Sequence, residues 1–154
     1  MQFTFRPMSE QAAQAIVQWK YDEPYSFYNI ENDPDDIAEL LEPQNWPARF
    51  YEVVDKDNNL IGFLEIMQDA SVVELGLGLR PDHTGKGLGC DFLSAALNFV
   101  MQSFAPVLFR LKVAVFNERA IRVYTKAGFQ VVETIRQRTN GGEHEFLCMT
   151  RSAF

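Results

Sequence analysis

One stretch of this 154-residue chain limits its fold more than any other, because an apolar run passes through three alternating glycines into a pattern with helical spacing. It reads LGLGLRPDHTGKGLG over residues 75–89. The glycines at 85, 87 and 89 predict a strand that leads through a tight turn into a helix. Successive backbone N–H groups in such a turn, together with the helix N-terminus, can hold an anion. A tight turn that needs glycine for its backbone alone is the alternative.

Two common phosphate-binding motifs do not fit this segment. A P-loop needs glycine at position 80 and Ser or Thr after the lysine, whereas this chain has Arg80 and, after Lys86, Gly87. A Rossmann fingerprint counted from Gly85 needs glycine at position 90, which is Cys90. Both nucleotide-binding folds are therefore disfavoured.

Periodicity and turn residues predict the elements along the rest of the chain. Strands are expected at residues 2–6, 49–55, 60–68, 71–79 and 107–116, with a final hairpin of the segments from Phe129 and Glu143 around Asn140-Gly141-Gly142. Four helices are expected. The first starts at the N-cap Ser9 and runs to Lys20, and the second has Asp33 as its N-cap, Pro34 at its first position and Leu41 at its end. The third runs from the glycine-rich turn to Ser103, and the fourth from Glu118 to Ala127.

The resulting order is β-α-α-β-β-β-α-β-α-β-β. It predicts an α/β (α+β) fold, a three-layer sandwich around a mixed, mostly antiparallel sheet of about seven strands. No repeat or linker divides the sequence, so residues 1–154 are expected to form a single domain.

Composition narrows the class of protein. Hydrophobic residues make up 47% of the chain and aromatic residues 13%, which suffices for a core and argues against disorder. The apolar runs are far shorter than the roughly 20 residues that span a bilayer, and the start lacks a signal-peptide pattern, so we expect a cytoplasmic protein without a membrane partner. Cys90, Cys148, His83 and His144 are too few for a disulfide framework or a Cys/His metal site, so no metal is expected.

Charge is divided unevenly along the sequence. Up to Glu74 there are 4 basic and 15 acidic residues, 4 − 15 = −11, whereas from Leu75 onward there are 10 basic and 6 acidic residues, 10 − 6 = +4. This pattern favours an anionic ligand for the second half and a cationic one near the first, although two solvated faces would give the same counts. A pI near 4.8 without a dense Lys/Arg patch argues against nucleic acid as a partner.

A second group of residues, Asn117, Ala120, Tyr124 and Gly128-Phe129, follows the strand expected at residues 107–116. Together with residues 84–89 it resembles the signatures of the GNAT superfamily of acyl-CoA-dependent N-acetyltransferases, in which the glycine-rich motif binds the CoA pyrophosphate. Both motifs have the order and the elements of that family, and the expected topology matches it throughout.

A finer resemblance rests on fewer residues. Arg6, Met8, Trp19 and the run Glu74-Leu75-Gly76 resemble the branch that contains ribosomal-protein and aminoglycoside acetyltransferases.

The family resemblance implies transfer of an acetyl group from the cosubstrate acetyl-CoA to a primary amine, by direct attack in a ternary complex. A cationic acceptor is expected, and a peptide N-terminus, lysine, polyamine, aminoglycoside or other small amine all remain open. A non-catalytic CoA-binding or sensing domain on the same fold is the alternative. A homodimer is compatible with the sequence, which does not decide the oligomeric state.

Two residues are candidates for catalysis. Tyr124 occupies the position of the family's general acid, which protonates the leaving thiolate; a core tyrosine is the alternative. Glu74 is expected to take the proton of the amine, because it shares a strand face with Gly76 and Gly78, which leave room for a ligand beside it. An ion pair with a neighbouring arginine is the alternative for Glu74, and Glu65 or water could replace it as the base.

The resemblance also assigns residues to acetyl-CoA. Those expected at acetyl-CoA are the strand residues Leu77 and Leu79, the loop residues Thr84, Gly85, Lys86, Gly87, Leu88 and Gly89, and Asn117, Arg119 and Lys126. Thr84 stands where the family usually has Arg or Gln, so its contact to the pyrophosphate is expected to be weaker or missing. Charge and composition, and not the resemblance, predict the acceptor at the loop of residues 19–31, through Trp19, Asp22, Glu23, Tyr25 and Tyr28, with Glu31 as a further acidic residue of the loop. Aromatic residues that only close the core, and a helix cap at Asn117, are the alternatives.

Overall fold

The computed structural model describes residues 1–29, 34–46, 49–139 and 142–154. The strands are β1 (Thr4–Pro7), β2 (Phe50–Val54), β3 (Leu60–Asp69), β4 (Val72–Leu79), β5 (Leu108–Ala114), β6 (Gln130–Thr139) and β7 (Gly142–Ser152). The helices are α1 (Glu10–Ile16), α2 (Pro34–Leu41), α3 (Gly89–Phe104) and α4 (Glu118–Lys126), with 3-10 turns η1 (Tyr25–Tyr28), η3 (Pro43–Asn45) and η4 (Pro81–His83). The predicted order of strands and helices is confirmed; the cap at Asp33, Glu31 and the turn at Asn140-Gly141 lie outside the described residues.

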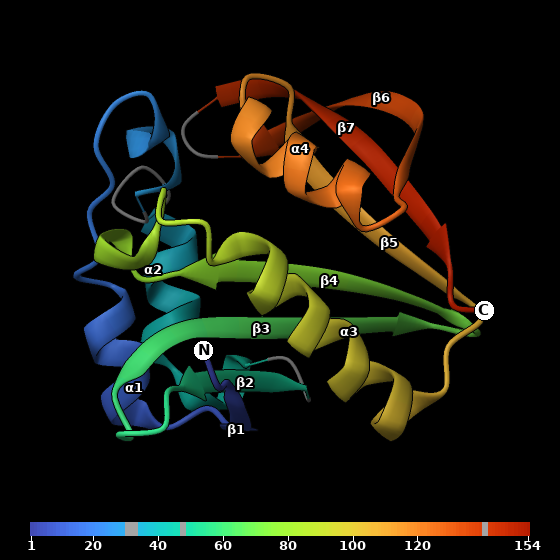
Figure 1. Cartoon of the computed structure of the whole chain (residues 1–154). Coiled ribbons are helices and arrows are strands. Elements are labelled where there is room, and N and C mark those ends of the chain that lie inside the picture. Colours follow the sequence, from blue (N-terminus) through green and yellow to red (C-terminus); the bar gives the residue numbers. More distant parts are fainter. Residues whose placement is uncertain (30–33, 47–48, 140–141) are drawn as a thin grey trace.

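The strands form one seven-stranded sheet in the order β1-β2-β3-β4-β5-β7-β6 (Figure 1). Every neighbouring pair is antiparallel except β4 and β5, which run parallel. The connection between these two parallel strands is helix α3, which follows the glycine-rich turn. The predicted mixed, mostly antiparallel sheet is therefore confirmed.

Helices cover both faces of the sheet and complete the expected three layers. Apolar residues of α3, including Phe92, Leu93 and Val100, pack with buried strand residues into the main core, and α4 packs against the same cluster. A second cluster joins Ile16 of α1 and Leu40 of α2 on the opposite face. None of the described helices has the length and hydrophobicity needed to cross a bilayer.

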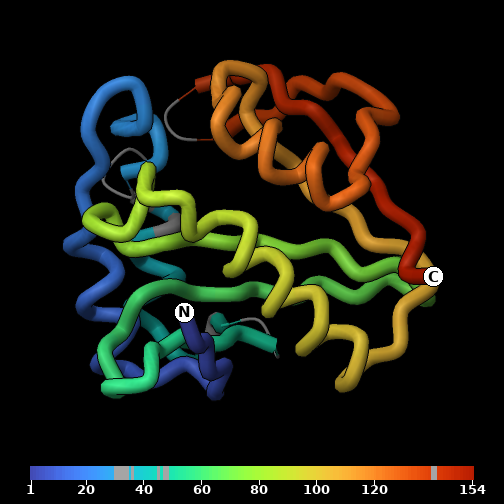
Figure 2. Tube along the Cα trace, in the orientation of Figure 1, coloured from blue at the N-terminus to red at the C-terminus, as the bar shows by residue number. Residues whose placement is uncertain are grey.

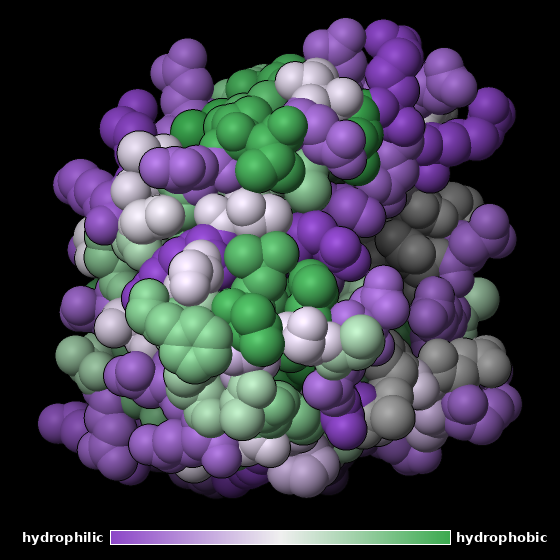
Figure 3. Space-filling model, turned by 90° about the vertical axis from the view of Figure 1, so that its right-hand side faces the viewer, coloured by the Kyte–Doolittle hydropathy of each residue, from purple (hydrophilic) through white to green (hydrophobic). Residues whose placement is uncertain are grey.

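Strands β4 and β5 part soon after they meet. Their pairing covers only Val72–Glu74 against Leu108–Arg110, after which β4 continues along β3 and β5 continues along β7. Figures 1 and 2 show the two strands diverging toward the end of the molecule where α1 and η1 lie. At the opposite end, where the strands meet, the surface is largely hydrophilic with separate hydrophobic patches (Figure 3).

Helix α1 ends earlier than its apolar pattern predicts. The helix was expected to reach Lys20, but it stops at Ile16, and the backbone N–H of Trp19 donates to the Ile16 carbonyl in a closing turn. The turn brings the Trp19 ring against Phe63 of β3, with the ring centroids 6.3 Å apart. Beyond this turn, residues 19–29 are not helical in continuation of α1 and cross the end of the sheet where β4 and β5 diverge.

Candidate active site

A cavity of about 930 Å³ occupies the gap between the diverging strands. Its wall includes Leu93 of α3 and Val123 of α4 on one face of the sheet, and Ile16 and Leu40 under the helices of the other face. The cavity therefore reaches through the sheet from one layer of helices to the other.

The turn between β4 and α3 has the backbone that its glycines predict. Gly85 and Gly87 have φ values of +70° and +77°, a region that side chains disfavour, and both line the cavity. At Gly89 a Cβ would lie only 3.1 Å from Cγ2 of Val123, so glycine lets α3 and α4 approach each other. Leu88 at the N-cap of α3 supplies no side-chain hydrogen bond, which leaves the first N–H groups of the helix available to an anion.

The other predicted loop residues have different surroundings. The Thr84 hydroxyl donates to the Pro81 carbonyl at 2.7 Å and closes η4, and Thr84 lines the cavity. The weakened pyrophosphate contact expected at this position stays a prediction. Lys86 is exposed, and neither Lys86 nor Leu88 belongs to the residues that line the cavity. Any contribution of Leu88 is therefore limited to its backbone.

Helix α4 brings positive charge to the same end of the cavity. Arg119, Arg122 and Lys126 line its wall. The Arg119 guanidinium lies 4.0 Å from the centroid of the Tyr25 ring, and one of its nitrogens is 3.2 Å from the point that a Cβ on Gly85 would occupy. An anion held by the glycine turn would therefore meet a guanidinium directly beside it.

The Asn117 side chain makes two hydrogen bonds within the protein. Its side-chain oxygen accepts from the Ala120 N–H at 3.1 Å, which caps α4, and its side-chain nitrogen donates to the Tyr28 hydroxyl at 3.0 Å. The helix cap is therefore present, and a pantetheine contact of Asn117, which is compatible with it, stays a prediction. Only the second N–H of this amide is left to reach a pantetheine group.

Tyr124 projects from α4 into the cavity wall and is half-buried. Burial, with a smaller contribution from Tyr28, raises the pKa of Tyr124 to about 12. The phenol therefore keeps its proton at neutral pH, which a group that donates a proton requires.

The backbone of β4 faces the gap at alternate residues. The Arg80 N–H donates to the Ile61 carbonyl, so the hydrogen-bonded pairs with β3 fall on residues 80, 78 and 76. The N–H and carbonyl groups of Leu79 and Leu77 then point away from β3, toward β5. For Leu79 this is visible directly, because its carbonyl accepts from the Tyr21 hydroxyl at 2.6 Å.

Glu74 lies where the two strands part and is held by cations. Its carboxylate is 2.7 Å from Arg110 Nε and 3.5 Å from Lys112 Nζ, and the residue is only 8% exposed. The ion-pair alternative for Glu74 is thus present. Whether Glu74 also removes a proton from the acceptor stays a prediction.

Only one of the two glycines beside Glu74 is needed to admit a neighbouring side chain. A Cβ at Gly78 would lie 2.1 Å from the Phe63 ring, whereas one at Gly76 would lie at an ordinary contact distance of 3.4 Å from the Glu65 carboxylate. Gly78 therefore makes room for Phe63 of the neighbouring strand β3, and Gly76 and Glu74 still face the cavity. Glu65, Phe63 and Glu74 all line the cavity.

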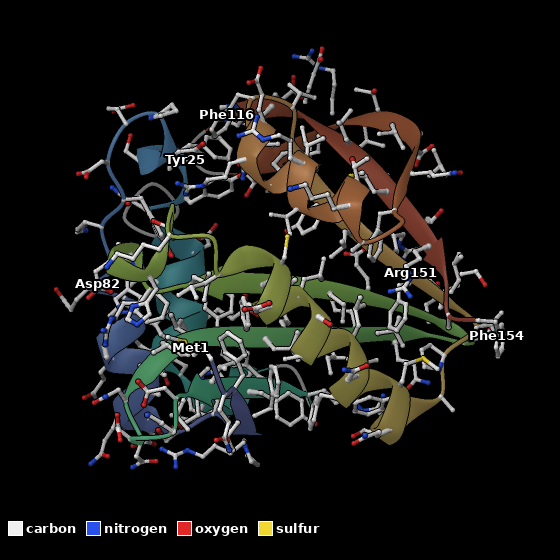
Figure 4. All side chains as sticks on the ribbon, viewed as in Figure 1. Met1, Tyr25, Asp82, Phe116, Arg151 and Phe154 are labelled. Carbon is white, nitrogen blue, oxygen red and sulfur yellow. The ribbon has the colours of Figure 1, made fainter. Side chains whose placement is uncertain are left out.

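Residues 19–29 form a strap across the open end of the sheet. The Tyr21 hydroxyl holds the strap to β4, and Phe116, after β5, contacts the rings of Tyr25, Phe27 and Tyr28 at centroid distances of 6.3, 5.3 and 5.8 Å. Figure 4 shows Tyr25 and Phe116 side by side at this end, and Figure 2 shows the strap reaching toward α4.

Only part of the strap faces the cavity. The predicted acceptor residues Trp19, Tyr25 and Tyr28 line it, whereas Asp22 and Glu23 are exposed and lie outside its wall. The cavity lining therefore gives no support to an acceptor contact of Asp22 and Glu23, which stays a prediction. The carboxylates of the cavity wall are instead Glu39, Glu65 and Glu74.

Sequence reasoning missed the residues on the α1/α2 side of the cavity. Trp46, Phe50, Phe63 and Glu39 line it, and they come from four different elements or turns. Their one sequence signal is the placement of Phe63 opposite Gly78 in the β3–β4 hairpin.

Among the described residues, no three His, Cys, Asp or Glu side chains are grouped as a metal site requires.

Comparisons with known proteins agree with this geometry. Residues 2–130 match the family model described as the acetyltransferase (GNAT) domain. The chain is 28% identical over 120 residues to spermidine N(1)-acetyltransferase of Vibrio cholerae serotype O1, an alignment that covers 74% of this chain and 65% of that relative, slightly less than two thirds of its length.

Solved structures of spermidine N-acetyltransferases share the fold. A chimera of the Vibrio cholerae enzyme SpeG with hSSAT has a TM-score of 0.80 at 22% identity, covering 99% of this chain and 96% of the other. The Vibrio cholerae enzyme in complex with CoA and spermine has a TM-score of 0.73 at 22% identity, again covering 99% and 96%. At this identity the likeness establishes the fold.

Proposed function

The chain belongs to the GNAT acetyltransferase family, and from that premise we propose that it transfers the acetyl group of acetyl-CoA to the primary amine of a cationic acceptor. The observation that carries this proposal is the cavity that passes through the sheet. One end has the glycine turn and the cations of α4, which suit the phosphates of CoA. The other end has aromatic and acidic side chains, which suit an alkylammonium group.

Acetyl-CoA is expected to lie along the free edge of β4. The pyrophosphate would accept from the N–H groups at Gly85, Gly87 and the start of α3, with Arg119 beside them. The pantetheine arm would then follow the outward-facing backbone of Leu79 and Leu77 into the gap, where the Leu77 N–H can donate to the thioester oxygen as charge develops.

The reaction needs one proton removed and one supplied. An alkylamine with a pKa of about 10.4 is mostly protonated at pH 7, which costs roughly 4 to 5 kcal/mol before attack. We assign removal of this proton to Glu65, because its carboxylate lies beside Gly76 at the edge of the gap and lines the cavity. The amine nitrogen then bonds to the acetyl carbon, the C–S bond breaks, and Tyr124 donates a proton to the CoA sulfur.

The similar proteins support the class of acceptor. Spermidine, in the name of the relative, and spermine, in the solved complex, are aliphatic amines with several positive charges. The carboxylates Glu39, Glu65 and Glu74 fit such an acceptor in this chain. Cytoplasmic localisation and a homodimer stay predictions from the sequence.

Release of CoA thiol from acetyl-CoA with a panel of amines tests the activity, and calorimetry tests the cofactor site.

Gly87→Val should abolish acetyl-CoA binding, because β-branching disfavours a φ of +77° and distorts the turn that holds the pyrophosphate. Gly128→Val is the matched control: its φ is +95°, but Gly128 lies outside the cavity wall. Unchanged affinity in folded Gly87→Val protein would refute the assignment.

A further inference from the structure

Four aromatic rings form a box on the α1/α2 side of the cavity, and we call Trp19, Trp46, Phe50 and Phe63 the aromatic box. Neighbouring members are 6.0 to 6.3 Å apart between ring centroids: Trp46 with Phe50, Phe50 with Phe63, and Phe63 with Trp19. All four line the cavity. The proton and acetyl transfers described above involve none of them.

The box is held in place by its surroundings. The Trp46 indole N–H donates to the Leu40 carbonyl at 2.8 Å, which ties this ring to α2. The Phe63 ring occupies the space that only glycine at position 78 leaves free. The rings are therefore positioned before any ligand enters.

Charge on this side of the cavity is negative. Glu39 of α2 and Glu65 of β3 line the wall together with the aromatic box. The lysines and arginines that line the described part of the cavity are Lys112 of β5 and Arg119, Arg122 and Lys126 of α4, so all of them come from the other side of the gap. Aromatic faces with carboxylates nearby attract a cation.

The strand register gives the distance between the box and the gap. Gly76 of β4 is paired with Glu65 of β3, and Glu65 is paired with Phe50 of β2. Adjacent strands lie about 4.8 Å apart, so Phe50 is about 10 Å from the edge of the gap, with Glu65 between them.

We infer that the aromatic box, with Glu39, binds a second ammonium group of the acceptor while its reacting amine lies in the gap at Glu65. This inference rests on the proposed function and deepens it. It makes the preferred acceptor an alkyl diamine long enough to span about two strand spacings. On this inference, the aromatic box and Glu39 determine which acceptor amine is preferred and take no part in the transfer of the acetyl group.

Intrinsic fluorescence can test the box without any acetyl transfer. The chain has 2 Trp residues, Trp19 and Trp46, and both belong to the box. Titration with octamethylenediamine, with no acetyl-CoA present, should change the fluorescence saturably. Octylamine, which has the same chain length but lacks the second ammonium group, should bind about tenfold more weakly, and ethylenediamine is too short to span the distance.

Variants separate the box from general charge effects. Glu39→Gln and Phe63→Leu should each weaken binding of octamethylenediamine by about three- to tenfold and raise its KM. Glu39→Gln should weaken octylamine less than octamethylenediamine, because octylamine has no second ammonium group. Asp57→Asn removes the same charge in an exposed turn outside the cavity and should change nothing.

Two outcomes would overturn the inference: equal affinity for octamethylenediamine and octylamine, or a diamine preference that survives both Glu39→Gln and Phe63→Leu. A diamine-specific fluorescence response that these variants weaken, in a protein that acetylates no amine, would support the box and refute the proposed function. The experiments therefore distinguish a failure of the aromatic box as a diamine site from a failure of the proposed acetyl transfer.

Discussion

At the scale of single residues, Tyr124 depends on its surroundings for its proposed role. A phenol with a pKa of about 12 keeps its proton at neutral pH, so it would protonate the CoA thiolate only where the two groups meet inside the cavity. Tyr124→Phe should keep the fold and the affinity for acetyl-CoA while lowering kcat by about 10²-fold. Single-turnover measurement of thiol release checks this, and wild-type rates under conditions where chemistry limits turnover would remove the role.

The half-buried Tyr21 and Tyr124 also make stability depend on alkaline pH. Burial raises the pKa of Tyr21 and of Tyr124 to about 12, whereas unfolded phenols titrate near 10. The stabilisation from these two groups is therefore complete below about pH 10 and is lost as the pH rises toward 12, because the unfolded state releases its protons first. Urea denaturation at several pH values should show this decline, and Tyr124→Phe should make it shallower; parallel curves would contradict the assignment.

At the scale of elements, the parting of β4 and β5 is secured by an ion pair. Glu74 lies at the last paired position, against Arg110. We expect Glu74→Gln to lower the free energy of unfolding by about 1 to 3 kcal/mol, less than for a fully buried pair because Arg110 is 33% exposed. The pH–rate profile should keep its shape, whereas Glu65→Gln should depress the rate at neutral pH and recover partly at higher pH.

A second ion pair provides the control for Glu74. Glu52 is buried, lies 2.9 Å from Arg6, and is outside the cavity wall. Glu52→Gln should reduce stability without any effect on the pH–rate profile. A profile that changes in Glu74→Gln but not in Glu52→Gln would transfer the base role back to Glu74.

At the scale of the whole molecule, the uneven charge of the sequence coincides with the two sides of the cavity. Glu39, Glu65 and Glu74 come from the acidic half, and the cations of α4 come from the basic half. The KM for a diamine acceptor should rise as ionic strength increases from about 0.01 to 0.15 M, because the Debye length falls from about 30 to 8 Å. Neutralising exposed Asp22 and Glu23 should change this KM little; a large change would restore them as acceptor residues.

Local signals were sufficient to predict the fold and the glycine turn. The φ values of Gly85 and Gly87 and the start of α3 follow from a short stretch of sequence, as does the cap at Asn117. The acceptor side could not be predicted in this way, since the aromatic box depends on the register of β2, β3 and β4 and on where α2 packs. The loop of residues 19–31 has no period, so nothing in its sequence indicates that Asp22 points outward.

The cavity's passage through the sheet has a consequence for the order of events. A tunnel with a single mouth would make the second substrate wait behind the first, and the products would have to leave in the reverse order. Here the wall belongs to both layers of helices, so under the proposed function CoA and the acetylated amine would each leave past a different layer. Free CoA would then compete with acetyl-CoA without blocking the amine, and one substrate would exchange without waiting for the other.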